Sequence, residues 1–287
     1  METLVKKYEE TINHNLKDIK SILKKDIGIK GGKINKEVEK IMRIAHQNLA
    51  SKWMTGKKYM RTFYVKKAFP QYPEDSLNLS ISLDVTINIL DDILDENLSK
   101  EIKALYLVEL IRTLSVYNKQ KSSNKLKRNI SNYFNKIISI AVLEGVYHQM
   151  IKAEVNEEKI VNYCMQIYDC RSLDMDIYAQ IPFIVLKENK KNINKIVKIA
   201  RIFRAVNLIK KDIDDLEHDK QNGIETAIIL LIEKGNAHNY LNKIIDLYVE
   251  KSKKINEQKN IEAINNFKKM IEEEHSKVSS LLKSIRG

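Results

Sequence analysis

The side chains best suited to chemistry are the aspartates of residues 81–98, ISLDVTINILDDILDENL. At 3.6 residues per turn, the polar residues of this stretch form one line along a helix: Asp84, Asn88, Asp91, Asp92 and Asp95. The surrounding residues are almost all apolar, so the helix should be buried with one acidic stripe. Buried carboxylates need cations, and hard oxygen ligands without nearby Cys or His favour Mg²⁺ over zinc.

A second acidic stripe lies in residues 193–220, which the apolar spacing predicts to be one continuous helix. Asp212, Asp215 and Asp219 follow one another at spacings of three and four and so stack on one face. Like charges stacked in this way repel one another unless a cation neutralises them. The sequence therefore predicts a second helix with an acidic face, in addition to the one in residues 81–98.

A cationic pair opens a shorter helix that starts near Gly56 and should stop near Pro70 and Pro73. Lys58 and Arg61 are three residues apart, so both lie on one side of the first turn, beside free backbone N–H groups. This arrangement suits an anion. A solvated basic helix start would be the default interpretation if this stretch stood alone.

A long helix over residues 125–155 carries Glu144, His148 and Gln149 inside an apolar pattern. These side chains could line a cavity, although a hydrogen-bonded core histidine is the more ordinary interpretation of His148. The next helix should begin at Asn156, whose side chain is a good helix cap.

The composition favours an all-α fold. With three prolines and eight glycines in 287 residues, the chain has few residues that form the tight turns of a β fold. Its abundant residues, Lys, Ile, Leu, Glu and Asn, are typical of long amphipathic helices. Further helices are expected over residues 3–25, 35–53 and 99–114, with a kink or a break at Pro182 and breaks near Gly223, Gly235 and Lys259. No internal repeat, low-complexity linker or composition shift is visible, so residues 1–287 are interpreted as one domain.

The charge and cysteine content narrow the classes of partner. The net charge of +12 suggests nucleic acid or an anionic membrane, but the lysines are dispersed and no aromatics are interleaved with them. Solvated helix faces explain them better, so no nucleic-acid partner is expected, and a basic surface would also attract a diphosphate. Cys164 and Cys170 suggest neither a zinc site nor a disulfide framework, which fits a cytoplasmic protein. The absence of a hydrophobic signal region or an 18-residue apolar run predicts no integral membrane segment.

Taken together, these motifs resemble the trans-isoprenyl diphosphate synthases, within the class I isoprenoid synthase family, over roughly residues 40–235. Residues 91–95, DDILD, match the family's DDxxD motif. Residues 58–62, KYMRT, are similar to the family's GGKRxRP motif. Residues 211–219, KDIDDLEHD, look like the second aspartate motif. Arg171 with Ser172 stands where the family often has Lys-Thr.

The resemblance implies a single-domain orthogonal bundle of about ten or more helices around a central apolar cavity, and a homodimer. It implies an enzyme that condenses an allylic prenyl diphosphate with isopentenyl diphosphate. Six aspartates would hold Mg²⁺: Asp91, Asp92, Asp95, Asp212, Asp215 and Asp219. Among these, Asp91 and Asp95 would act in catalysis with Arg171. The substrate-binding residues would be Lys58, Arg61, Arg171 and Gln149, with Thr86 and Ile87 as the floor of the tail pocket.

Several departures from the family pattern leave other functions open. The arginine pair that follows DDxxD in the family is missing, because residues 96–101 read ENLSKE. Tyr59, Thr62, Lys211 and Ile224 each replace a residue of the family's motifs. A class I terpene cyclase or lyase needs only the allylic substrate and so tolerates these losses. A non-catalytic partner subunit of a prenyl synthase is a second alternative, and a basic helical binding protein is a third.

Overall fold

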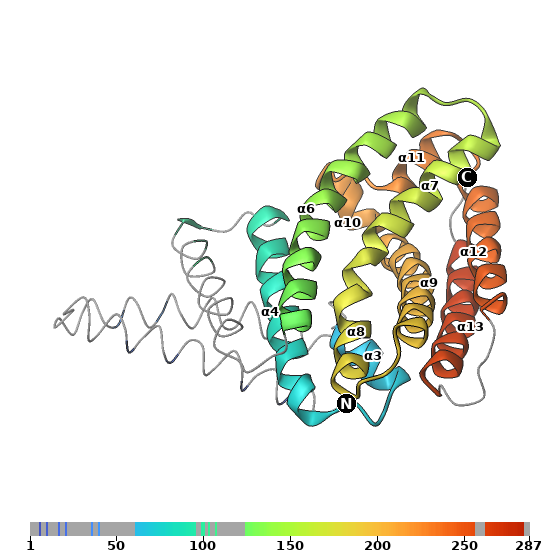
Figure 1. Ribbon diagram of the computed structural model, residues 1–287. Helices are drawn as coiled ribbons and strands as arrows, with labels where there is room; N and C mark the ends of the chain where they lie inside the picture. The colour runs from blue at the N-terminus through green and yellow to red at the C-terminus, as the bar shows by residue number, and fades with distance from the viewer. Residues whose placement is uncertain are drawn as a thin grey trace. The chain divides into compact units, whose positions relative to one another are not determined.

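The computed structural model describes residues 61–95, 124–255 and 262–283, with a few isolated positions elsewhere. Every regular element in these ranges is a helix, which confirms the all-α class (Figure 1). The chain divides into two compact parts, one of residues 1–66 and 71–127 and the other of residues 67–70 and 128–287. The single-domain interpretation of residues 1–287 stays a prediction.

The first part contains most of helix α3 (Arg61–Ala68) and all of helix α4 (Glu74–Asp95). The carbonyl oxygen of Pro73 accepts hydrogen bonds from the backbone N–H groups of Ser76 and Leu77, so α4 begins directly after this proline. The helix therefore starts about two turns before the predicted Ile81. Its apolar side chains are buried as expected: Leu77, Leu79, Ile81, Leu83 and Ile87.

The second part is built around one central helix, α9 (Lys190–Asp214). It packs against α7, α8, α12, α13 and a short 3₁₀ segment, and Figure 1 shows it between α8 and the pair α12 and α13. The bounds of the other elements are α6 (Asn124–Ala153), α7 (Glu157–Arg171), the 3₁₀ segment η1 (Ser172–Met175), α8 (Asp176–Val185), α10 (Leu216–Gln221), α11 (Ala227–Glu233), α12 (Ala237–Lys253) and α13 (Glu262–Leu282).

Several predicted boundaries are confirmed. The Asn156 side chain accepts a hydrogen bond from the backbone N–H of Lys159, at 3.1 Å, and caps α7. Gly223 and Gly235 have φ of +66° and +79°, a conformation that favours glycine, and each follows a helix that ends there.

Two predictions about helix breaks are wrong. Pro182 lies inside α8, which continues to Val185, and the Pro182 carbonyl accepts a hydrogen bond from the backbone N–H of Leu186, so the proline does not break the helix. The alternative of a kink at Pro182 stays a prediction. The helix predicted to run unbroken to Lys220 is interrupted at Asp215. This residue is the C-cap of α9 and the N-cap of α10.

Some predictions fall on other parts of the chain. The helices predicted over residues 3–25, 35–53 and 99–114 lie outside the described ranges, as does Lys58. A break near Lys259 is consistent with the end of α12 at Lys253 and the start of α13 at Glu262. Within the described residues, no helix is long and apolar enough to cross a membrane.

Candidate functional site

The first acidic motif occupies the last turns of α4. The backbone of Asp91, Asp92 and Asp95 is helical, as the DDxxD spacing predicts, while their side chains lie outside the described residues. Their part in holding Mg²⁺ therefore stays a prediction.

Asp84, the first residue of the predicted polar line, has a structural partner. Its Oδ2 accepts a hydrogen bond from the backbone N–H of Thr62 at 2.8 Å, and its Oδ1 lies 3.3 Å from Nη1 of Arg61. Burial raises the pKa of Asp84, while the Arg61 charge and the Thr62 bond lower it. Arg61, predicted to bind a diphosphate, is thus buried and gives at least one donor to Asp84.

The neighbouring polar residues of α4 are satisfied within the helix. Asn88 Nδ2 donates to the carbonyl of Asp84 at 2.6 Å, and Thr86 Oγ1 donates to the carbonyl of Ser82 at 2.9 Å. Thr86 is fully buried and Ile87 nearly so. The first two members of the acidic stripe, Asp84 and Asn88, are therefore hydrogen-bonded within the protein. The tail pocket predicted beside Thr86 and Ile87 stays a prediction.

In the second motif, Asp212 forms the best-defined contact of the site. Arg171 donates to both of its carboxylate oxygens, at 2.6 Å to Oδ2 and 3.1 Å to Oδ1, and the Tyr168 hydroxyl donates to Oδ2 at 3.2 Å. A bidentate arginine–carboxylate pair is among the strongest polar contacts in proteins. The structure thus brings two predicted site residues together, Arg171 of α7 and Asp212 of α9, and adds Tyr168.

Arg171 is also held from a third helix. Its Nε lies 3.8 Å from Oε1 of Glu144 on α6. Burial lowers the pKa of Arg171, but the carboxylates of Asp212 and Glu144 outweigh this effect and raise it overall. The guanidinium is therefore a fixed positive charge at this site.

Asp215 has the opposite electrostatic environment. Burial raises its pKa, and the carboxylates of Asp219, Asp212 and Asp214 raise it further, while only Lys211 lowers it. Because Asp215 stands at the break between α9 and α10, its carboxylate is half-buried among like charges. A divalent cation bound to Asp215 and Asp219 would relieve this repulsion, and the part of these two residues in holding Mg²⁺ stays a prediction.

A buried histidine extends the network on α6. His148 Nδ1 lies 3.4 Å from Oε1 of Glu225. Its Nε2 has no hydrogen-bond partner among the residues that the structure describes, and lies 3.9 Å from Oε1 of Glu144. Burial lowers the pKa of His148, so the neutral imidazole is favoured. Lys152 pairs with the other oxygen of Glu225. Gln149, predicted to contact substrate, is exposed.

The sequence indicated several residues of this site, but not the side chains that they contact. Nothing in the spacing indicated that the Tyr168 hydroxyl reaches Asp212 or that Glu225 reaches His148, because these contacts join distant segments. A second buried pair, Asp174 with Arg204 at 2.7 Å, was also missed. Both partners left a signal in the sequence, since Asp174 and Arg204 are each a charged residue in apolar surroundings.

A hollow between α6 and α8 has a volume of about 120 Å³. It is lined by Asn129, Asn132, Tyr133, Lys136, Asp176, Ile177 and Gln180. This lining is too polar for a prenyl chain, so the central apolar cavity stays a prediction. Within the described residues, no three His, Cys, Asp or Glu side chains converge as a metal-binding group.

Comparison of the chain with protein-family models, with curated proteins and with solved structures gives no match.

Proposed function

We propose that this chain is a Mg²⁺-dependent prenyltransferase that condenses an allylic prenyl diphosphate with isopentenyl diphosphate. The observation that carries the proposal is the pairing of opposite environments in the second motif. Arg171 is a fixed cation bonded to Asp212, while Asp215, one turn along the chain, is a carboxylate surrounded by like charges. A site that must hold both a metal ion and a diphosphate needs both kinds of group.

Each residue then has a distinct part. The proposed ligands of Mg²⁺ are Asp215 and Asp219 of the second motif and Asp91 and Asp95 of the first. Bound Mg²⁺ would act as a Lewis acid on the leaving diphosphate. Asp212 has both oxygens engaged by Arg171, so we assign it a positioning part rather than a place among the metal ligands. Oriented in this way, Arg171 offers its remaining donors to a diphosphate oxygen.

The second substrate is the weaker half of the proposal. Lys58 and Arg61 would bind the diphosphate of isopentenyl diphosphate, but Arg61 is buried against Asp84. This contact favours the second candidate, a class I terpene cyclase or lyase that acts on the allylic diphosphate alone. A non-catalytic partner subunit would share the same metal-binding residues.

One assay separates these candidates. The purified chain is incubated with Mg²⁺ and an allylic diphosphate, with and without isopentenyl diphosphate, and both the released diphosphate and the organic products are measured. A longer prenyl diphosphate that forms only with both substrates supports the proposal. Hydrocarbon or alcohol formed without isopentenyl diphosphate supports the cyclase, and binding of Mg²⁺ and diphosphate without turnover supports the partner subunit.

Adjacent aspartates provide a matched pair of variants. Asp215→Asn should lower kcat by about 100-fold or more, because metal ligation supplies several kcal/mol of transition-state stabilisation. Asp214→Asn removes the same charge from an exposed residue that pairs with Lys210, and should change kcat less than about threefold. Equal effects of the two variants would contradict the assignment of Asp215.

A further inference from the structure

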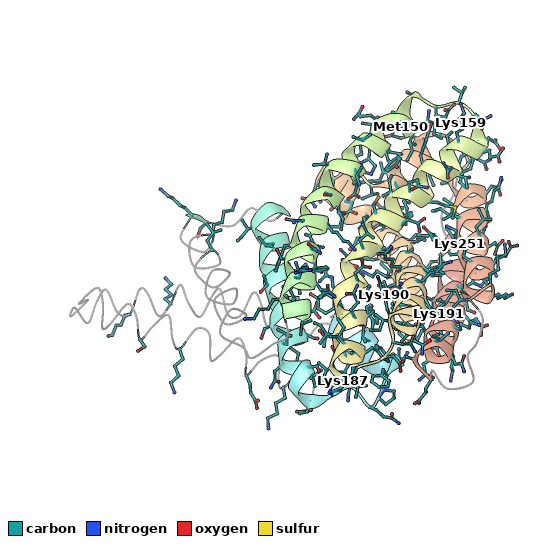
Figure 2. All side chains as sticks on the ribbon, in the orientation of Figure 1. Met150, Lys159, Lys187, Lys190, Lys191 and Lys251 are labelled. Atoms are coloured by element: carbon teal, nitrogen blue, oxygen red, sulfur yellow. The ribbon has the colours of Figure 1, made fainter. Side chains whose placement is uncertain are left out.

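The turn between α8 and α9 carries a concentrated positive charge. Five lysines lie between residues 187 and 198, with Glu188 as the one acidic residue among them. We call these lysines the basic turn: Lys187, Lys190, Lys191, Lys195 and Lys198. Figure 2 labels Lys187, Lys190 and Lys191, which lie at the junction of the two helices.

None of these five lysines forms an ion pair within the part of the chain that the structure describes. Glu188 instead accepts hydrogen bonds from the backbone of Asn189 and from the side chain of Asn192. Other lysines of the same part are paired, such as Lys136 with Asp176 and Lys234 with backbone carbonyls. The charge of the basic turn is therefore available to an external partner.

The lysines also share a direction. Lys191, Lys195 and Lys198 follow one another at spacings of four and three, so they lie on one face of α9. Neighbouring positions such as Ile193, Ile196 and Val197 are buried in the core. The basic face is thus the outward face of the central helix at its first turns.

Two exposed aliphatic side chains precede these lysines. Val185 is 44% exposed and Leu186 is 51% exposed, at the last turn of α8. The preceding aromatic, Phe183, is buried and packs against Phe69 with ring centroids 4.8 Å apart, so the end of α8 is anchored. Lys187 then has φ of +55°, which turns the chain sharply away from the helix.

The chemistry of this surface distinguishes among anionic partners. Single-stranded nucleic acids are bound by aromatic side chains that stack on the bases, and residues 185–198 contain none. Double-stranded nucleic acid is bound through its phosphates, which offer nothing to the exposed side chains of Val185 and Leu186. An anionic bilayer offers phosphates to the lysines and an apolar layer to the exposed aliphatic pair. We propose that the basic turn, with Val185 and Leu186, docks this protein onto the surface of an anionic membrane. This proposal does not depend on the proposed function.

The test is sedimentation of the full chain with phosphatidylcholine vesicles, with and without roughly 30% phosphatidylglycerol, a composition chosen to mimic an anionic leaflet. Binding should require the anionic lipid and weaken with salt. Each lysine near such a surface contributes about fivefold to binding, so the triple variant Lys187→Gln, Lys190→Gln, Lys191→Gln should bind about 100-fold more weakly.

Two further variants make the test specific. The variant Lys243→Gln, Lys253→Gln, Lys254→Gln loses the same charge from exposed positions on and just after α12, and should lose less than about fivefold in binding. The pair Val185→Ser, Leu186→Ser keeps the charge and should lose about tenfold, because it removes apolar area that would enter the bilayer.

Three results would overturn the proposal. Equal losses in the two lysine variants would indicate attraction by net charge alone. Equal binding to neutral vesicles would exclude the lysines as the source of binding. Binding of an oligonucleotide that requires the basic turn, without binding of anionic vesicles, would assign the surface to nucleic acid instead.

Discussion

At the scale of single residues, Asp212 connects three helices, because it accepts hydrogen bonds from α7 while its neighbour in the pair, Arg171, also faces Glu144 of α6. Removing one member of a buried ion pair costs far more than the pair contributes, since the other charge is left without a partner. The network should therefore be sensitive to loss of the carboxylate.

Asp212→Ala should lower the free energy of unfolding by about 3–5 kcal/mol, because Arg171 keeps its charge without its bidentate partner. Tyr168→Phe removes one hydrogen bond of 3.2 Å to the same carboxylate and should cost about 1 kcal/mol. Urea denaturation followed by circular dichroism measures both values. Similar losses in the two variants would show that Asp212 does not hold Arg171 as described.

Substitution of Asp215 should have the opposite effect on stability from substitution of Asp212. Its folded pKa is raised above the ordinary value of 3.8, so the folded chain binds more protons than the unfolded chain between these two values. Stability from this group is thus lost as the pH rises through that window. Asp215→Asn should therefore have a higher Tm than the parent at pH 7, and the difference should vanish below pH 3.8, where both states are protonated.

Magnesium provides the control for that measurement. Because a bound cation relieves the repulsion at Asp215, Mg²⁺ at pH 7 should raise the Tm of the parent more than that of Asp215→Asn. A variant that is less stable than the parent at pH 7 would contradict the described environment of Asp215.

At the scale of elements, local rules predicted the helices well and their interruptions less well. Asn156 and the two glycines act on their own backbone, so their effect is visible in the sequence. The break at Asp215 was missed because the apolar period of α9 continues across it, through Ile213 and Leu216, which are both buried. Side-chain partners such as Arg171 and Asp212 were missed because their pairing depends on how α7 packs on α9.

The glycines give a prediction about these interruptions. Alanine at Gly223 would meet no neighbouring atom but would have to keep φ at +66°, so Gly223→Ala should cost about 1 kcal/mol through backbone strain alone. Gly145, inside α6 and equally open, is the matched control, and Gly145→Ala should stabilise by about 0.5–1 kcal/mol. Thermal unfolding of both variants tests the pair, and a stabilising Gly223→Ala would contradict the described turn.

At the scale of the whole molecule, composition correctly predicted helices throughout the described residues. With so few prolines and glycines, the chain has little means of making the turns of a sheet, whatever the details of packing. The net charge of +12 is also a property of the whole chain, and it acts at longer range than any single contact. This charge should attract a diphosphate substrate, and added salt should screen the attraction.

Under the proposed function, kcat/KM for the allylic diphosphate should fall about tenfold between 0.1 and 1 M KCl, because the Debye length shrinks from about 10 Å to about 3 Å. The value of kcat should change little, since Arg171 and Asp212 are largely shielded from solvent and salt screens such pairs weakly. Steady-state diphosphate release at fixed Mg²⁺ measures both constants. The triple variant of the basic turn lowers the net charge from +12 to +9 and should show a smaller salt dependence than the parent. A salt-independent kcat/KM would mean that substrate is captured by the buried groups alone, without attraction by the rest of the surface.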